Sequence, residues 1–178
     1  MAIKPTIYKF RINLSDLNRD IYEAYNLTVA LHPSETAERM MARVLAYCLE
    51  AREDLVFCKG LSDVEEADLW VPVHDGKTPL WVDVGEPTAE RVKKAGRLAD
   101  EVAIYCFNSK ADTWWSINGA KIQREAKSLR VVQFNWSEVE ALSAQLERTM
   151  DLSVTLTGQS AYLAGDSMQA EINWQTLL

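Results

Sequence analysis

Two aspartates, Asp68 and Asp83, bracket a segment whose pattern predicts a β-hairpin. The segment contains Asp75-Gly76, a dipeptide typical of a two-residue type I′ turn. A turn centred there places positions 68 and 83 opposite each other on one face, because side chains alternate along a strand. Two opposed carboxylates destabilise a strand pair. A divalent cation, a shared proton or a nearby Lys or Arg would relieve the repulsion, so the pair is a candidate Mg²⁺ or Mn²⁺ site.

The alternation of apolar residues supports this register. The residues on the opposite face of the hairpin are all apolar: Leu69, Val71, Val73, Leu80, Val82 and Val84. We expect this face to pack into the core, whereas Trp70 and Trp81 share the face of the two aspartates.

Two features leave the assignment open. Pro72 and Pro79 would face each other in a hydrogen-bonded pair, and proline cannot donate, so a loop longer than two residues is an alternative. Any loop with an even number of residues about the same centre keeps both aspartates on one face, whereas a one-residue slip separates them. The aspartates also have a purely structural interpretation, in which Asp68 begins a strand and Asp83 helps to cap the next helix.

Further carboxylates lie on a helix that His32-Pro33-Ser34-Glu35 is expected to open. An apolar stripe at helical spacing follows, made of Met40, Met41, Val44, Leu45, Cys48 and Leu49. Glu38 lies on the flank of this stripe, and Glu35 lies further round, towards water. A carboxylate at the edge of a buried face needs a partner. It would be a metal ligand beside the two aspartates, or it would form a salt bridge with one of Arg39, Arg43 and Arg91.

A basic helix is predicted directly after Asp83. The segment Gly85-Glu86-Pro87-Thr88 has the residues of a helix start, and the helix is expected to reach about Glu101. Its polar side carries four cations, namely Arg91, Lys93, Lys94 and Arg97. Strand–turn–helix geometry brings the first turns of this helix close to Asp83, so Arg91, Lys93 or Lys94 could neutralise charge at the site. Simple solvation of a charged helix face explains the same residues.

Together these residues suit the hydrolysis of a phosphodiester. A cation held by two strand carboxylates, with a helix carboxylate as a further ligand, would stabilise the pentacoordinate phosphate and activate water. The sequence contains no Gly-rich phosphate loop after a strand and no G-x-S-x-G elbow. Trp114 and Trp115 could stack bases. Adjacent helix positions point about 100° apart, however, so we expect at least one of the two in the core.

Composition narrows the classes of function. The chain has 178 residues, a net charge of −7 and a pI near 4.9, which argues against a broad basic surface but permits a local cationic cleft. Cys48, Cys58 and Cys106 form no C-x-x-C pair and lie on apolar stretches, so we expect buried free thiols in a reducing cytoplasm. The sequence shows neither a signal-peptide pattern nor a long apolar run, so we expect a cytoplasmic protein without a membrane partner.

The order of predicted elements gives an α/β (α+β) fold in one domain, residues 1–178. Alternation predicts an antiparallel strand pair over Thr6–Leu14 and Ile21–Leu31. The core order from residue 34 to 107 is helix, strand, strand, strand, helix, strand. Later elements are a helix from Asn108, a strand over Leu129–Phe134, a helix capped at Ser137 that reaches about Arg148, and three short strands near the C-terminus. Residues 34–134 form the expected core, and residues 1–31 and 150–178 form flanking antiparallel strands.

Four stretches carry a resemblance to the bacterial YaeQ family over nearly the whole chain. They are Thr6-Ile-Tyr-Lys, His32-Pro-Ser-Glu-Thr-Ala-Glu-Arg-Met-Met, Leu80-Trp-Val-Asp-Val-Gly and Arg91-Val-Lys-Lys-Ala. The core order also resembles the PD-(D/E)XK nuclease fold, the fold of restriction endonucleases. The resemblance implies a variant of that fold, with Asp68 as the first acid and Asp83 as the second. Helix carboxylates reach the site in that superfamily, which nominates Glu38 or Glu35.

One position departs from the nuclease pattern. The superfamily lysine should lie two residues after the second acid, where this chain has Gly85. A lysine or arginine from the next helix would have to replace it, and Lys94, Lys93 and Arg91 are the candidates. The expected function is therefore either a Mg²⁺- or Mn²⁺-dependent nuclease, or a binding module that kept the fold without the turnover. The family resemblance implies nucleic acid or the transcription elongation machinery as the partner, and we expect a monomer.

Overall fold

The computed structural model describes residues 4–59, 63–73 and 75–178, and within them the chain is an α+β protein with a mixed sheet. The helices are α1 (Ala37–Glu50), α2 (Ala89–Leu98), α3 (Ala111–Ile122) and α4 (Trp136–Ser143). The first strands are β1 (Thr6–Asp16), β2 (Ile21–Leu31), β3 (Val56–Phe57), β4 (Leu69–Val71) and β5 (Thr78–Val84). The later strands are β6 (Ala99–Cys106), β7 (Leu129–Phe134), β8 (Thr149–Thr157), β9 (Ser160–Ala164) and β10 (Gln169–Thr176). No helix in these residues is both long and apolar enough to cross a membrane.

The strands form one sheet in the order β2-β1-β8-β9-β10-β7-β6-β5-β4-β3. Strand β6 is parallel to both of its neighbours, β5 and β7, and β1 is parallel to β8, while the other pairs are antiparallel. The long strand β10 joins the two halves, because it pairs with β9 through Gln169–Asn173 and with β7 through Trp174–Thr176. The terminal strands therefore continue the same sheet that holds the predicted core.

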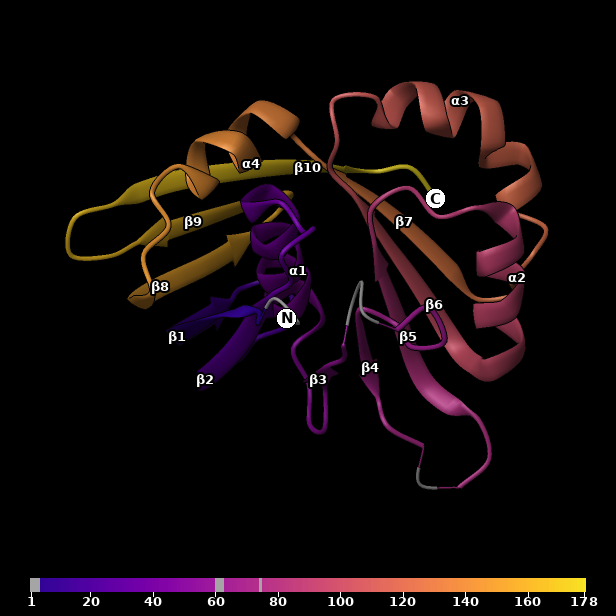
Figure 1. Ribbon diagram of the computed structural model, residues 1–178, viewed down its shortest axis with the longest axis horizontal. Helices are drawn as coiled ribbons and strands as arrows, with labels where there is room; N and C mark the ends of the chain where they lie inside the picture. Colours follow the sequence, from indigo (N-terminus) through magenta and orange to yellow (C-terminus); the bar gives the residue numbers. More distant parts are fainter. Residues whose placement is uncertain (1–3, 60–62, 74) are drawn as a thin grey trace.

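The sheet curves around α1 until its two ends approach each other (Figure 1). Tyr47 of α1 stacks on Phe57 of β3 with ring centres 5.2 Å apart. The same ring meets Tyr25 of β2 edge-on at 5.5 Å. The two edge strands thus contact one aromatic ring, and the sheet is nearly closed like a barrel. Helices α2 and α3 cover the other side of β5 to β7 (Figure 1).

The predicted register of the hairpin is confirmed. Leu69 pairs with Val82, and Val71 pairs with Leu80, which places position 68 beside position 83. Val71 and Leu80 are the last paired residues, so residues 72–79 connect the paired positions, and this connection is longer than two residues but still centred on Asp75-Gly76. The apolar face is buried except for Val73, which follows the strand and is exposed. Residue 74 lies outside the described residues.

Several predicted helix boundaries are wrong. Helix α1 begins at Ala37 rather than within residues 32–35, because the Thr36 hydroxyl accepts a hydrogen bond from the Arg39 N–H and caps the helix. Helix α2 ends at Leu98 rather than near residue 101, because β6 begins at Ala99, whose pairing with Thr78 takes these residues into the sheet.

The last helix is shorter than expected and starts earlier. Asn135, rather than Ser137, accepts a hydrogen bond from the N–H of Glu138 and caps α4, which ends at Ser143 instead of near residue 148. The element order from α1 to β6 matches the predicted helix, three strands, helix and strand.

A buried carboxylate ties α1 to the centre of the sheet. Glu50, at the end of α1, accepts hydrogen bonds from Tyr105 (2.6 Å), from Arg130 (2.7 and 3.0 Å) and from Arg52 (2.8 Å). Burial alone would raise the pKa of Glu50, but the hydrogen bonds and charges of Arg130, Tyr105 and Arg52 bring it below its ordinary value. The ionised carboxylate therefore holds the helix against β6 and β7.

We predict that Glu50→Gln lowers the free energy of unfolding by about 2–3 kcal/mol at neutral pH, because charge-assisted bonds to a buried group are lost. A carboxylate with a lowered pKa stabilises the fold above its unfolded pKa, and this contribution is lost as pH falls through the folded pKa. The gap between the two proteins should therefore narrow below about pH 4. Urea unfolding from pH 7 to pH 3 measures it, with exposed Glu53→Gln as the control. A gap independent of pH would contradict the assignment.

Candidate functional site: an acid–arginine pocket

Asp68 is fixed at the start of the hairpin by bonds to both of its oxygens. Its Oδ2 accepts a hydrogen bond from the backbone N–H of Val84 at 2.8 Å. Its Oδ1 accepts one from Nη2 of Arg39 on α1 at 2.6 Å, and the same nitrogen lies 3.3 Å from the Val84 carbonyl oxygen. The side chain is 5 % exposed. Asp68 therefore joins α1 to the end of β5.

Asp83 has its own arginine. Its Oδ2 accepts from Nε of Arg91 at 2.8 Å, and its Oδ1 accepts from Nη2 of Arg91 and from the Trp81 indole N–H, both at 3.0 Å. Arg91 also donates to the carbonyl oxygens of Val64 and Glu66, at 2.8 and 2.9 Å. The arginine thus clamps the loop before β4 onto the Asp83 strand, so part of its role is structural.

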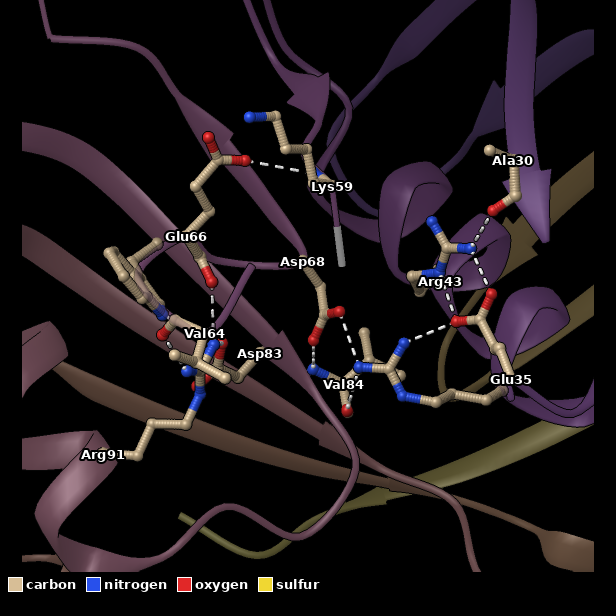
Figure 2. A network of polar contacts seen from close by, with 12 residues as sticks. Ala30, Glu35, Arg43, Lys59, Val64, Glu66, Asp68, Asp83, Val84 and Arg91 are labelled. Carbon is tan, nitrogen blue, oxygen red and sulfur yellow. Dashed lines mark hydrogen bonds and ion pairs between the residues drawn. The ribbon is translucent and has the colours of Figure 1, made fainter. Parts of the chain in front are cut away.

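Glu35 is buried, which contradicts the expectation that it points to water. It precedes α1, and its two oxygens accept hydrogen bonds from Arg43 at 2.6 and 3.0 Å. Arg39 donates to Glu35 at 2.5 Å through Nη1 and to Asp68 through Nη2, so it bridges the two carboxylates. The side chains of Glu35 and Arg43 are 1 % and 3 % exposed. Figure 2 shows Asp68 between this pair and the Asp83–Arg91 pair.

The two aspartates open into one pocket of about 350 Å³. It lies at the carboxyl ends of β5 and β6, and its walls include Arg39, Arg91, Glu86 and Asn108. Glu86 adds a third carboxylate: its Oε2 accepts from the Asn108 side chain at 2.7 Å, while its Oε1 is buried and has no hydrogen-bond partner among the described residues. The pocket therefore combines two cations with several carboxylates around a small space.

Gly85 has a conformational reason to be glycine. Its φ is +118°, a backbone conformation that residues other than glycine adopt only with strain. Its N–H donates to the carbonyl oxygen of Tyr105 at 2.8 Å. A Cβ at this position would meet no atom within 4 Å, so backbone conformation and not space disfavours a lysine there. The backbone turn that brings Glu86 to the pocket therefore requires glycine at the position where a lysine was expected.

Charge is not fully balanced around Asp83. Burial raises the pKa of the Asp83 carboxyl, and Asp68 raises it further, while Arg91 and Trp81 offset only part of this effect. For Arg39, burial would lower the pKa, but Asp68 and Glu35 raise it above its ordinary value. Arg39 thus keeps its charge through two carboxylates, whereas Arg91 and Trp81 compensate the buried charge of Asp83 only in part.

The remaining predicted residues lie at different distances from this pocket. Lys94 forms an ion pair with Glu65, on the loop that Arg91 holds. Lys93 is exposed and lines a separate groove further along α2. Glu38 is half-buried in the first turn of α1 and forms no ion pair with any described residue. Of the three predicted cations, Arg91 alone lines the pocket.

Sequence reasoning missed three residues of the pocket. Arg39 was considered only as a salt-bridge partner, although it contacts both Glu35 and Asp68. Glu86 and Asn108 were treated only as parts of helix starts, although each lies two residues after the end of a parallel strand. The signal that identifies them is this position, because ligands of such sheets bind outside the carboxyl ends of the strands.

The donors of the pocket suit a hard divalent cation that keeps water or substrate ligands. Carboxylate oxygens are what Mg²⁺ prefers, and it is often held by one or two carboxylates plus phosphate oxygens. Asp68 and Asp83 would be those two ligands. Residues 4–59, 63–73 and 75–178 contain no cluster of three His, Cys, Asp or Glu side chains arranged to hold a metal. Asp68 and Asp83 could therefore hold such a cation only together with water or substrate ligands, and both carboxylates are bonded to arginines in the structure.

Comparison with known proteins shows which family this chain resembles over nearly its whole length. The family model described as "YaeQ protein" matches residues 1–174. The chain is 38% identical over 179 residues to "Uncharacterized protein YaeQ" from Escherichia coli (strain K12), covering 98% of each chain. It is 37% identical, over the same share of both chains, to the protein of that name from Salmonella typhi.

Solved structures agree in fold. The crystal structure of the YaeQ protein from Pseudomonas syringae has a TM-score of 0.91 and 33% identity, covering 98% of this chain and 96% of that one. The crystal structure of the YaeQ protein from Xanthomonas axonopodis pv. citri has a TM-score of 0.92 and 32% identity, covering 97% of this chain and 98% of that one.

The buried position of Glu35 gives a direct test of the site. We predict that Glu35→Gln destabilises the protein by about 3–5 kcal/mol, because it leaves the buried guanidinium of Arg43 without its counter-charge. Glu38→Gln, on the same helix start, should cost less than about 1 kcal/mol through the helix dipole alone. Urea unfolding of both variants measures the difference. Equal losses would contradict the arrangement of the two glutamates.

Proposed function

This chain belongs to the YaeQ family, and from that premise we propose that it is a Mg²⁺- or Mn²⁺-dependent phosphodiesterase acting on nucleic acid. The observation that carries the proposal is the single pocket shared by Asp68 and Asp83 at the carboxyl end of β5. The order of α1, β3, β4, β5, α2 and β6 supports a variant of the PD-(D/E)XK core.

The roles follow from the charges of the pocket. Asp68 and Asp83 would hold the cation, which would supply charge stabilisation at phosphate and activation of water. In the structure Asp68 bonds to Arg39, and Asp83 bonds to Arg91. If a cation and a phosphodiester entered together, the cation would replace the arginines at the carboxylates. Arg39 and Arg91 would then bond to the phosphate oxygens. Because neither exchange is favourable alone, we expect cation and phosphate to bind cooperatively.

A basic groove at the other end of α2, where β5, β6 and β7 begin, supports nucleic acid as the substrate. It is lined by five exposed cations, Lys77, Lys93, Arg97, Arg124 and Lys127, with Asp100 and Glu125 as the acids among its lining residues. None of these five side chains forms an ion pair with an acid in the part of the chain that the structure describes. Helix α2 connects the two sites, because it carries Arg91 at its start and Lys93 and Arg97 further on. A phosphate backbone could follow α2 from groove to pocket despite the net charge of −7.

The second candidate function is a binding module that has lost turnover. Gly85 at the lysine position favours it, and so does the arginine that each aspartate already holds. In this reading the same pocket and groove bind nucleic acid, or the transcription machinery that the family resemblance suggests, and the arginines never release. The two functions differ in whether Asp83 is needed for cleavage or only for stability.

Metal titration separates these candidates. We predict that isothermal titration of the wild type with Mn²⁺ gives a binding signal that strengthens when a single-stranded oligonucleotide is present. Asp83→Ala should abolish this signal and lower cleavage of DNA or RNA by more than about 100-fold, since it removes a direct ligand. Asp75→Ala, in the exposed hairpin loop, is the matched control. Metal binding without cleavage of any nucleic acid would favour the binding module, and absence of metal binding would refute the metal-dependent enzyme.

The groove makes a separate prediction about salt. The double variant Lys93→Gln/Arg97→Gln should weaken oligonucleotide binding at low salt. It should also reduce the slope of log affinity against log salt by roughly 1.4–1.8, if each cation contacts one phosphate. The double variant Lys4→Gln/Lys9→Gln removes the same charge near and on β1 and should leave the slope unchanged. Equal effects of the two variants would mean that only net charge matters.

A further inference from the structure

A second pocket lies beside the first, along the same edge of the sheet. It has a volume of about 500 Å³ and is formed where β7 ends, α4 begins and β10 crosses. Asn108, which follows β6, lines both pockets. The carboxyl ends of β5, β6 and β7 are adjacent in one parallel set, so the two pockets together extend over about two strand spacings, or roughly 10 Å. Ligands of open α/β sheets bind along this edge.

The chemistry of the second pocket differs from that of the first. Its walls contain Trp136 and Trp174 together with side-chain amides, and Asp112 is the single charged side chain among its lining residues. No arginine or lysine lines it, so it is unsuited to a phosphate. Aromatic rings with amides beside them suit a flat, neutral, hydrogen-bonding ring.

The two tryptophans are supported from behind and remain partly exposed. Trp174 meets Phe134 edge-on, with ring centres 6.3 Å apart, and Trp136 lies 6.3 Å from Phe107. Both side chains are half-buried. Neither indole N–H donates a hydrogen bond to a described residue. Both indole nitrogens remain accessible, so each N–H can donate to water or to a ligand. A ring held in this way offers both surface and a donor to a ligand at little cost in conformational entropy.

The amides of the pocket are already oriented. The Gln175 side-chain N–H donates to Oε1 of Gln133 at 3.0 Å, and the Gln133 side-chain N–H donates to Oδ1 of Asp112 at 3.0 Å. These hydrogen bonds orient Gln133 and Gln175 on the face of β7 and β10 opposite to the Trp174–Phe134 pair, because side chains alternate along a strand, and they leave lone pairs of Gln175 and Asp112 for a ligand. Such acceptors match the exocyclic amino groups and ring N–H groups of nucleobases.

We propose that this second pocket holds one unpaired nucleobase of the nucleic acid whose phosphate enters the acid–arginine pocket. The inference rests on the proposed function and deepens it by naming the form of the substrate. A base inside a duplex is stacked and paired, so it reaches a pocket at this edge only from a single strand or after it leaves the helix. The substrate is therefore a single-stranded or extruded nucleotide, with Asn108 between its phosphate and its base.

The test compares two fluorescently labelled strands of equal length, one with bases and one with an abasic backbone, by anisotropy in Ca²⁺. The wild type should bind the strand with bases roughly 5- to 100-fold more tightly, the range expected when one base stacks. Trp174→Ala should lose this preference while binding the abasic strand as the wild type does. Trp174→Phe should retain most of the preference, because the ring stays packed on Phe134.

Controls distinguish this inference from the proposed function. Trp115→Ala truncates a half-buried tryptophan on α3 outside the pocket and should keep the full preference. Asp83→Ala should keep it too, because the base pocket does not include that carboxylate. Equal binding of both strands by the wild type overturns the base pocket and leaves the phosphodiesterase untouched. A preference for bases without metal binding or cleavage refutes the phosphodiesterase and supports the base pocket. Binding of neither strand overturns both.

Discussion

Pairing of buried carboxylates with arginines is the constraint on which the rest of the site depends. Removing an ionised carboxylate from water is costly unless a cation and hydrogen bonds replace the water. Glu35, Asp68 and Asp83 are all nearly fully buried, and Arg39, Arg43 and Arg91 supply their hydrogen bonds. Because these arginines come from α1 and α2, the same bonds also fix both helices against the end of β5. The same arginine–carboxylate bonds therefore both neutralise the buried charges and hold the helices in place.

The curvature of the sheet brings these groups together. Helix α1 lies inside the curve, where Tyr47 touches both edge strands and Glu50 reaches β6 and β7. Helix α2 lies on the other side of β5. Asp68 and Asp83 sit on the strand pair between the two helices, so each receives an arginine from a different layer.

The two pockets lie along one edge of the sheet, and α2 links that edge to the basic groove. The acid–arginine pocket and the second pocket, which contains Trp136 and Trp174, share Asn108. The basic groove lies at the other end of α2. Their chemistries are complementary to the parts of a nucleotide: charge for the phosphate, aromatic rings and amides for the base, and cations for the backbone beyond it. This division is the physical basis of the proposal that nucleic acid is the ligand, although the overall charge of the chain is negative.

Local pattern accounts for much of the fold. Alternation placed Phe10, Ile12 and Leu14 in the core, and the Asp75-Gly76 centre gave the hairpin register, because both depend on residues close in sequence. Helix ends were less accurate. The segment after Leu98 has helical spacing, yet pairing of Ala99 with Thr78 makes it a strand, and a partner 21 residues away leaves no local signal.

The sequence by itself determined the family, the order of elements, and the hairpin register that places Asp68 opposite Asp83. These follow from residue identity and from periodicities of two and 3.6 residues. Only the tertiary structure decided that Glu35 is buried and Glu38 is not paired with it, and that Arg39 bridges two carboxylates. It also decided that Gly85 owes its identity to a positive φ and that Glu86 and Asn108 meet across the sheet edge. Partnerships between residues far apart in sequence depend on how the sheet curves, and no local pattern encodes that curvature.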